Sequence, residues 1–191
     1  QQLNTYSYAR NNPLMFTDPD GQEIDVGTHN VFGSWYHTSI RIIPENQELY
    51  KDNPNFSNTL EDGRVYATLG AGSNEGDLLG GINRTRDVDQ QNKMPFTPVD
   101  IGNLNEDLVI NSLFDSSNNY QGQLDYDLFP RIDGARRWWV ADDGYNSNSY
   151  TSGLLNSVGL DVPTVDYNTP GYDKPVPVEN FRSKKEEDAD R

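Results

Sequence analysis

Cysteine is absent from the 191 residues of this chain, and histidine occurs only twice. The absence of cysteine excludes disulfide bonds, zinc–thiolate centres and a thiol nucleophile in the chain as it stands. With His29 and His37 as the only histidines, the nuclease chemistry of the HNH type is poorly supported. The chain therefore lacks the residues that many catalytic and metal-binding mechanisms require.

Positive charge is also scarce. The chain has 15 Lys and Arg residues against 30 Asp and Glu residues, which gives a net charge of −15. Nucleic acids and anionic membranes are bound by clustered basic residues, so we expect neither partner. No apolar run approaches the roughly 20 residues that span a bilayer, and no signal peptide opens the chain, so we expect no integral membrane segment. Because the first residue is Gln1 and not Met, we expect a piece of a longer protein.

Aromatic residues are the main indication of a folded core. They make up 11% of the chain, whereas all hydrophobic residues together reach 34%. The length fits one domain with appendages better than two domains. We expect an opening segment over residues 1–25, a folded domain over 26–168 and a disordered tail over 169–191. The tail has spaced prolines and a final run of mixed charge, with no apolar period.

Three short stretches of the middle segment have the composition of strands. Residues 39–43 alternate partly between apolar and polar and end at a proline. Residues 64–69 end at the sequence Gly-Ala-Gly over 70–72, which predicts a turn, and residues 136–140 contain two adjacent tryptophans. These features predict strands separated by Asn- and Asp-rich loops.

One helix is predicted over residues 103–114. Asn103 or Asn105 can cap it, and acidic residues follow in the first turn, where the helix dipole favours them. Its apolar residues recur at helical spacing. The side chains that we expect on the buried face are Leu104, Leu108, Val109 and Leu113.

A second helix is predicted over residues 148–158, and its beginning could carry chemistry. Ser147 or Asn148 can act as the N-cap, which is the ordinary interpretation of a hydroxyl or amide there. A nucleophile at the same place would benefit from the helix dipole and the free backbone amides, which favour a developing negative charge. Both interpretations can hold, because neighbouring residues can divide the two roles.

The two histidines differ in their surroundings. His29 lies in a loop-like context, whereas His37 lies just before the predicted strand over residues 39–43. A lone histidine is more often structural or exposed than catalytic. His37 becomes a catalytic candidate only in combination with Ser147, at the start of the predicted helix.

Residues 4–21 resemble the last repeat of an Rhs-repeat core, through the pattern N-x-Y-x-Y-x-x-N-N-P-L-x-x-x-D-P-D-G. In that family, the part after this motif is usually a toxin or effector that the repeats enclose and that is delivered to another cell. The resemblance implies an exported or delivered effector of interbacterial competition. Its implied partners are the Rhs shell of the full-length protein and an immunity protein.

Residues 35–42 (WYHTSIRI) and 145–155 (YNSNSYTSGLL) together resemble the circularly permuted papain-like cysteine hydrolases. This superfamily includes bacterial cell-wall endopeptidases and lecithin-retinol-acyltransferase-like enzymes. The resemblance implies an α+β fold in which a small antiparallel sheet packs against helices. It further implies that His37 is the general base, that residue 147 is the nucleophile and that the backbone N–H of residue 147 helps to hold the oxyanion. The substrate would be a peptide, peptidoglycan or a lipid, with cell-wall peptide as the first expectation.

Ser147 departs from this family, whose nucleophile is a cysteine in an Asn-Cys sequence. Either serine replaces that cysteine and inactivates the enzyme, or the chain is a natural serine enzyme or an inactive homologue. We favour inactivation, because imidazole readily generates a thiolate from a thiol of reference pKa ~8.5, whereas a hydroxyl is far more basic. The chain also lacks the G-x-S-x-G sequence of many serine hydrolases.

The residue that would orient His37 is left open by the sequence. Asp62, Asn74 and Glu75 flank the predicted strand over residues 64–69 and are the candidates. Three Asp-rich fragments, over residues 18–21, 87–89 and 125–127, resemble pieces of calcium loops, but none has the full spacing of such a loop. We therefore expect no metal and no cofactor.

A function from a different class is also compatible with the sequence. The chain could be a non-catalytic binding or adhesion module on an Rhs-type shell, in which case the missing thiol would have no significance. The distance between the side chains of His37 and Ser147 discriminates between the two hypotheses, since a base and a nucleophile must lie within hydrogen-bonding reach.

Overall fold

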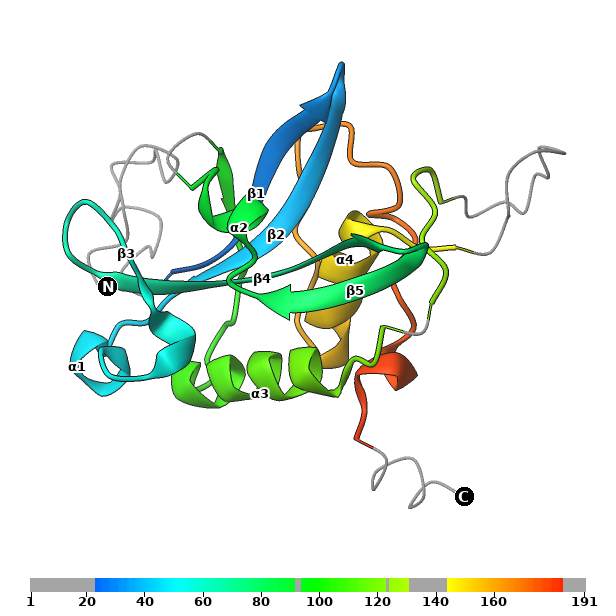
Figure 1. The fold of residues 1–191 in the computed structure, drawn as a ribbon. Helices are drawn as coiled ribbons and strands as arrows, with labels where there is room; N and C mark the ends of the chain where they lie inside the picture. Colours follow the sequence, from blue (N-terminus) through cyan, green and yellow to red (C-terminus); the bar gives the residue numbers. More distant parts are fainter. Residues whose placement is uncertain (1–22, 92–93, 123, 131–143, 184–191) are drawn as a thin grey trace, which may run out of the picture.

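The computed structural model describes residues 23–91, 94–122, 124–130 and 144–183. Their centre is a six-stranded antiparallel sheet in the order β3-β4-β2-β1-β6, with β5 paired to β4 (Figure 1). The strands are β1 (Glu23–Phe32), β2 (Trp35–Ile43), β3 (Asn58–Thr59), β4 (Val65–Asn74), β5 (Asp77–Ile82) and β6 (Phe96–Pro98).

Four α-helices accompany the sheet within the described residues. They are α1 (Gln47–Tyr50), α2 (Thr85–Val88), α3 (Glu106–Asn119) and α4 (Ser147–Ser157), and two short 3-10 helices, η2 (Pro54–Phe56) and η3 (Val178–Phe181), join them. The expected α+β class with a small antiparallel sheet and packed helices is therefore confirmed. None of these helices is long and apolar enough to cross a membrane.

One face of the sheet is apolar because β-branched and aliphatic residues alternate with polar ones along the strands. On this face, β-branched apolar residues of β1 lie opposite β-branched apolar residues of β2, as in the pairs Ile24–Ile42 and Val26–Ile40. Leu113 of α3 and Leu154 of α4 belong to the same buried cluster, so these helices cover this face. The strand residues of the cluster include Ile24, Val26, Ile40, Ile42, Ala67, Leu69 and Ala71.

The opposite face of the sheet is polar, and α2 packs against β4 on this face. A Cβ atom at Gly70 of β4 would lie only 2.3 Å from a carboxylate oxygen of Asp87 in α2. Adjacent strand residues differ in orientation, so Gly70 faces α2 while its neighbours Leu69 and Ala71 face the core. In Figure 1, α2 accordingly lies above β4 and α3 lies below it.

The prediction of a turn at residues 70–72 is wrong. β4 runs through these residues and ends only at Asn74. Both glycines are strand residues whose missing side chains leave room for polar groups. At Gly72 a Cβ atom would lie 2.2 Å from the guanidinium of Arg84, just as one at Gly70 would meet Asp87. Glycine inside a strand often marks a site where another group approaches the backbone closely.

The predicted helices are present, but their boundaries differ. α3 has Asn105 as its N-cap and ends five residues beyond the prediction, at Asn119. Leu104 and Leu108 do not lie on its buried face but are exposed, whereas Val109 and Leu113 are buried as expected. The cap of α4 is Asn146, one residue before the expected candidates. The predicted strand over residues 136–140 lies outside the described residues.

The described part of the chain extends the fold beyond the expected limits of 26 and 168. β1 begins at Glu23. In the segment assigned to a tail, Val176 and Phe181 are buried, and the ring of Phe181 lies 5.3 Å from that of Tyr120 and 5.5 Å from that of Tyr150. Residues 169–183 thus pack against α3 and α4.

We predict that Phe181→Ala lowers the free energy of unfolding by about 3–5 kcal/mol, because it removes a buried ring and leaves a cavity between α3 and α4. Val178→Ala in the same 3-10 helix is the matched control, since Val178 is exposed and should change stability by no more than about 0.5 kcal/mol. Urea unfolding followed by circular dichroism measures both. Equal midpoints for the two variants would contradict the packing described here.

Candidate active site

The site begins with an edge of β2 that the sheet leaves uncovered. β4 pairs with β2 only at Ile40, Arg41 and Ile42, and beyond these residues it pairs only with β5, which lies along its other edge. The backbone groups of Tyr36 and Thr38 on this edge therefore need partners from outside the sheet, since an unpaired buried backbone group is costly. The N–H of Tyr36 donates to the carbonyl of Asn168, at 2.9 Å.

Helix α4 supplies the remaining partners through its first turns. The side-chain oxygen of Asn148 accepts from the N–H of Thr38 at 2.7 Å, and its amide nitrogen donates to the carbonyl of Tyr36 at 2.9 Å. One turn later, the hydroxyl of Thr151 donates to the carbonyl of Thr38, at 3.1 Å. Asn148 therefore acts like a neighbouring strand and fixes the start of α4 against β2.

The N-cap residue Asn146 holds the first turn of α4 in place. Its side-chain oxygen accepts from the backbone N–H groups of Asn148 and Ser149, at 2.9 and 3.1 Å. Its amide nitrogen donates to the carbonyl of Pro170 at 2.8 Å, which ties the helix start to a loop from the C-terminal segment. Ser147 lies between these two anchoring asparagines.

This arrangement places Ser147 against His37. The Oγ of Ser147 lies 2.7 Å from Nδ1 of His37, within ordinary hydrogen-bonding distance, although the two residues are 110 positions apart in the sequence. Both are buried, with 7% and 5% of their surfaces exposed. The structure thus brings together the two residues that the sequence analysis had singled out, and their distance is that of a base and its nucleophile.

The second ring nitrogen of His37 contacts Asp87, which lies in α2 on the polar face of the sheet. Nε2 of His37 lies 2.8 Å from Oδ1 of Asp87, whose side chain is completely buried. Asp87 therefore contacts the ring nitrogen of His37 that faces away from Ser147. The three candidates for that position lie elsewhere: Asp62 is bound to Arg64, and Asn74 and Glu75 lie at the β4–β5 connection.

The position of Asp87 depends on its neighbours in β4 and α2. The missing side chain of Gly70 leaves the space that its carboxylate occupies. The guanidinium of Arg84 lies 3.4 Å from its second oxygen, Oδ2, and also donates to the carbonyl of Ala71. A buried carboxylate needs such partners, because transfer of an unpaired charge out of water is expensive.

His29 is the other histidine of this region and lies directly across from His37 on β1. The two ring centroids are 4.7 Å apart. Neither ring nitrogen of His29 has a hydrogen-bond partner among the described residues. Burial, reinforced by the nearby His37, lowers the pKa of His29 to about 4. At neutral pH His29 is therefore an uncharged ring packed against His37.

Comparisons with protein-family models, with curated proteins and with solved structures found no match. The assignment of function therefore depends on the residues themselves. Among the described residues, no group of three or more His, Asp or Glu side chains is placed to hold a metal ion. What the geometry provides is a linear chain of hydrogen-bonding groups, from a hydroxyl through an imidazole to a carboxylate.

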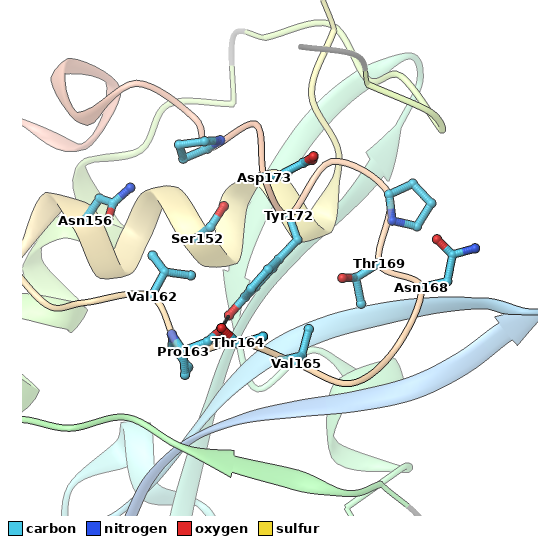
Figure 2. A pocket seen from close by; sticks show the side chains of 12 residues that line it. Ser152, Asn156, Val162, Pro163, Thr164, Val165, Asn168, Thr169, Tyr172 and Asp173 are labelled. Carbon is cyan, nitrogen blue, oxygen red and sulfur yellow. Dashed lines mark hydrogen bonds between the residues drawn. The ribbon is translucent and has the colours of Figure 1, made fainter.

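Two cavities lie near α4, and only one of them belongs to this site. The larger, of about 660 Å³, is lined by residues such as Ser152, Asn156 and Tyr172, and the hydroxyl of Tyr172 donates to the carbonyl of Pro163 at 3.1 Å (Figure 2). Neither His37 nor Ser147 lines it. The smaller, of about 260 Å³, is lined by His37 and by the two asparagines that flank Ser147.

Asp87 is the member of this hydrogen-bonded chain that the sequence did not indicate. It had been considered only as part of an Asp-rich fragment over residues 87–89, and it lies in a four-residue helix with no periodic pattern of its own. The available signal was indirect. A glycine inside an otherwise apolar strand, as at Gly70, indicates that another group approaches the backbone closely there.

We predict that Asn148→Ala lowers the free energy of unfolding by at least about 2 kcal/mol, because it leaves the N–H of Thr38 and the carbonyl of Tyr36 without partners. Asn118→Ala is the matched control. It lies on an exposed position of α3 and should change stability by no more than about 0.5 kcal/mol. Chemical unfolding of both variants is the measurement, and a small effect at both positions would contradict the strand-like role of Asn148.

We predict that His29 makes the protein less stable as the pH falls below about 6.5. The pKa of His29 is about 4 in the folded protein and 6.5 in the unfolded chain, so protons are taken up on unfolding between these values and stability is lost as pH decreases. At pH 5 the loss relative to pH 7 is about 1–2 kcal/mol. The His29→Phe variant keeps a ring against His37, and its free energy of unfolding should fall less between pH 7 and pH 5. Unfolding curves at both pH values test this, and identical losses in the two proteins would rule it out.

Proposed function

We propose that this chain is a delivered bacterial effector domain built for acyl transfer, which hydrolyses or transfers an amide or ester bond. Residue 147 is the nucleophile, His37 is the general base and Asp87 is the residue that orients it. The observation that carries the proposal is the continuous contact from Ser147 Oγ to His37 Nδ1 at 2.7 Å and from His37 Nε2 to Asp87 Oδ1 at 2.8 Å.

The carboxylate of Asp87 determines which nitrogen of His37 carries the proton. A carboxylate only accepts, so the proton lies on Nε2 and the lone pair of Nδ1 is free to take the proton of the nucleophile. His37 then becomes an imidazolium that Asp87 stabilises, and it later returns this proton from Nδ1 to the leaving group. In chymotrypsin-type triads the two nitrogens have the opposite roles, but the chemistry is equivalent.

The start of α4 supports stabilisation of the oxyanion. The side chain of Asn146 occupies the backbone N–H groups of Asn148 and Ser149, whereas the N–H of Ser147 has no hydrogen-bond partner among the described residues. This free donor lies at the positive end of an 11-residue helix, next to the attacking atom. Such a donor stabilises the negative charge that develops on the carbonyl oxygen.

The identity of residue 147 determines how fast this site can work. With serine, His37 must remove a proton from a hydroxyl, which demands a strong base and a complete oxyanion hole. With cysteine, the same imidazole generates a thiolate, which is the nucleophile of the papain-like hydrolases that the two sequence segments resemble. We therefore propose that Ser147 makes the chain a weakly active or inactive form of a cysteine-type hydrolase.

The circularly permuted papain-like assignment and the role as an Rhs-associated toxin are parts of this proposal. The two resembling segments fall on β2 and on the start of α4, which are the elements whose side chains meet. The Rhs-like residues 4–21 lie outside the described residues and support the proposal by sequence alone. A non-catalytic binding module would not need a buried chain of three hydrogen-bonded groups, so the geometry favours acyl transfer. By the sequence resemblance alone, cell-wall peptide is the first expectation for the substrate.

We predict that Ser147→Cys produces a thiol that iodoacetamide alkylates at nearly the same rate from pH 7 down to pH 5. An ordinary thiol of pKa ~8.5 loses about tenfold in rate per pH unit over this range, because only the thiolate reacts. A thiolate paired with His37 keeps its charge, so its alkylation rate stays nearly constant over this pH range, as a plateau in the pH profile. Intact mass gives the rates directly, since the chain has no other cysteine.

Two further variants and one control make this experiment specific. In the Ser147→Cys background, His37→Ala should restore the steep pH dependence, and Asp87→Asn should move the plateau to higher pH. Ser73→Cys in the otherwise unchanged chain supplies an ordinary exposed thiol of the same protein. A steep profile for position 147 that matches position 73, whether or not His37 is present, would overturn the proposed function.

A further inference from the structure

The proposed function leaves unused a group of exposed apolar side chains next to His37. Four of the exposed large apolar residues of the described chain line the pocket of about 260 Å³ that reaches this histidine: Val31, Phe32, Leu128 and Phe129. Phe32 has 73% of its surface exposed. Exposed apolar side chains that gather in one place, rather than scatter, mark a surface that binds something.

Aromatic contacts give this pocket a defined wall. The ring of Trp35 packs edge-on against Phe129 with centroids 4.4 Å apart, and it lies 5.8 Å from the ring of Phe32 on the other side of the β1–β2 turn. The three rings come from two distant parts of the chain, a hairpin tip and the segment before α4. Edge-on packing at such distances is favourable beyond simple burial, so the wall exists before any ligand binds.

The floor of the pocket belongs to the reaction centre. His37 lines it, as do Asn146 and Asn148, the residues on either side of Ser147. A group held in this pocket therefore lies beside a carbonyl that residue 147 attacks. Among the described residues that line the pocket, Arg86 alone has a permanent charge, so a cationic group would be repelled there.

We propose that this pocket holds an uncharged, apolar group of about the size of one aromatic ring, on the substrate next to the bond that is cleaved. A cavity of about 150 Å³ lined by apolar side chains already accommodates benzene, so 260 Å³ suffices for a ring and its linking atoms. The inference depends on the proposed function and specifies its substrate: the recognised group is an aromatic or branched aliphatic residue or acyl group.

The test uses the Ser147→Cys protein and three reagents that differ only in the group on nitrogen: 2-chloroacetamide, N-benzyl-2-chloroacetamide and N-dodecyl-2-chloroacetamide. For each, the labelling rate from intact mass is divided by the rate with N-acetylcysteine, which removes intrinsic differences in reactivity. We expect the benzyl reagent to gain about 10-fold over chloroacetamide, because burial of one ring stabilises the complex by that order. The dodecyl reagent should gain no more than the benzyl reagent.

Variants of the wall identify the pocket as the cause. Trp35→Ala and Phe129→Ala, each combined with Ser147→Cys, should reduce the benzyl preference to less than about 3-fold. Leu108→Ala is the matched control, because it removes an exposed leucine from α3 and should leave the 10-fold preference intact. A preference that survives both wall variants would overturn the assignment to this pocket.

The failures of the two proposals can be told apart. A steep pH profile with chloroacetamide shows that no activated thiolate exists, and then the proposed function fails. If the pH profile has a plateau but the normalised labelling rates of the three reagents are equal, the proposed function stands and the pocket inference is overturned. Rates that keep rising to the dodecyl reagent would overturn the ring-sized limit and point to a lipid chain.

Discussion

The backbone of β2 imposes the constraint on which the rest of this structure depends. Once β4 leaves β2 beyond Ile40, the groups of Tyr36 and Thr38 have no strand to pair with. Polar side chains from α4 take that place, and Asn148 alone makes contacts with a donor and an acceptor of the strand. The helix is therefore held by directional bonds and not by apolar packing alone. Its position along β2 is fixed to within one residue, because any shift would break these bonds.

This constraint explains how a site forms from both sides of a sheet. Asp87 approaches from the polar face through the space above Gly70, whereas Ser147 comes from a helix that packs on the apolar face. The two can meet at His37 only where β2 has lost its neighbour, since a continuous sheet would separate them. The divergence of β4 from β2 is thus the structural condition for the hydrogen-bonded chain from hydroxyl to carboxylate.

The sequence predicts the parts of this site that are local, and it fails where the cause is distant. The strand around His37 and the helix after Ser147 follow from short patterns of apolar spacing and capping residues. The role of Asp87 does not, because it arises from packing against Gly70, in a strand that the sequence alone ends too early. The same limit applies to Phe181, whose burial depends on a surface made by two helices and not on its own neighbours in the chain.

The composition of α4 connects its docking to the chemistry. Nine consecutive residues, from Ser147 to Leu155, are buried, although five of them are serine, threonine or asparagine. Buried polar groups stabilise a unique arrangement only when each has a partner, and in α4 those partners are β2 and the segment around Pro170. The side chain of Ser147 takes no part in this hydrogen bonding to β2 or to the segment around Pro170 except through His37, which is its hydrogen-bond partner among the described residues. An exchange between hydroxyl and thiol at this position can therefore change the reactivity of the site without moving the helix that presents it.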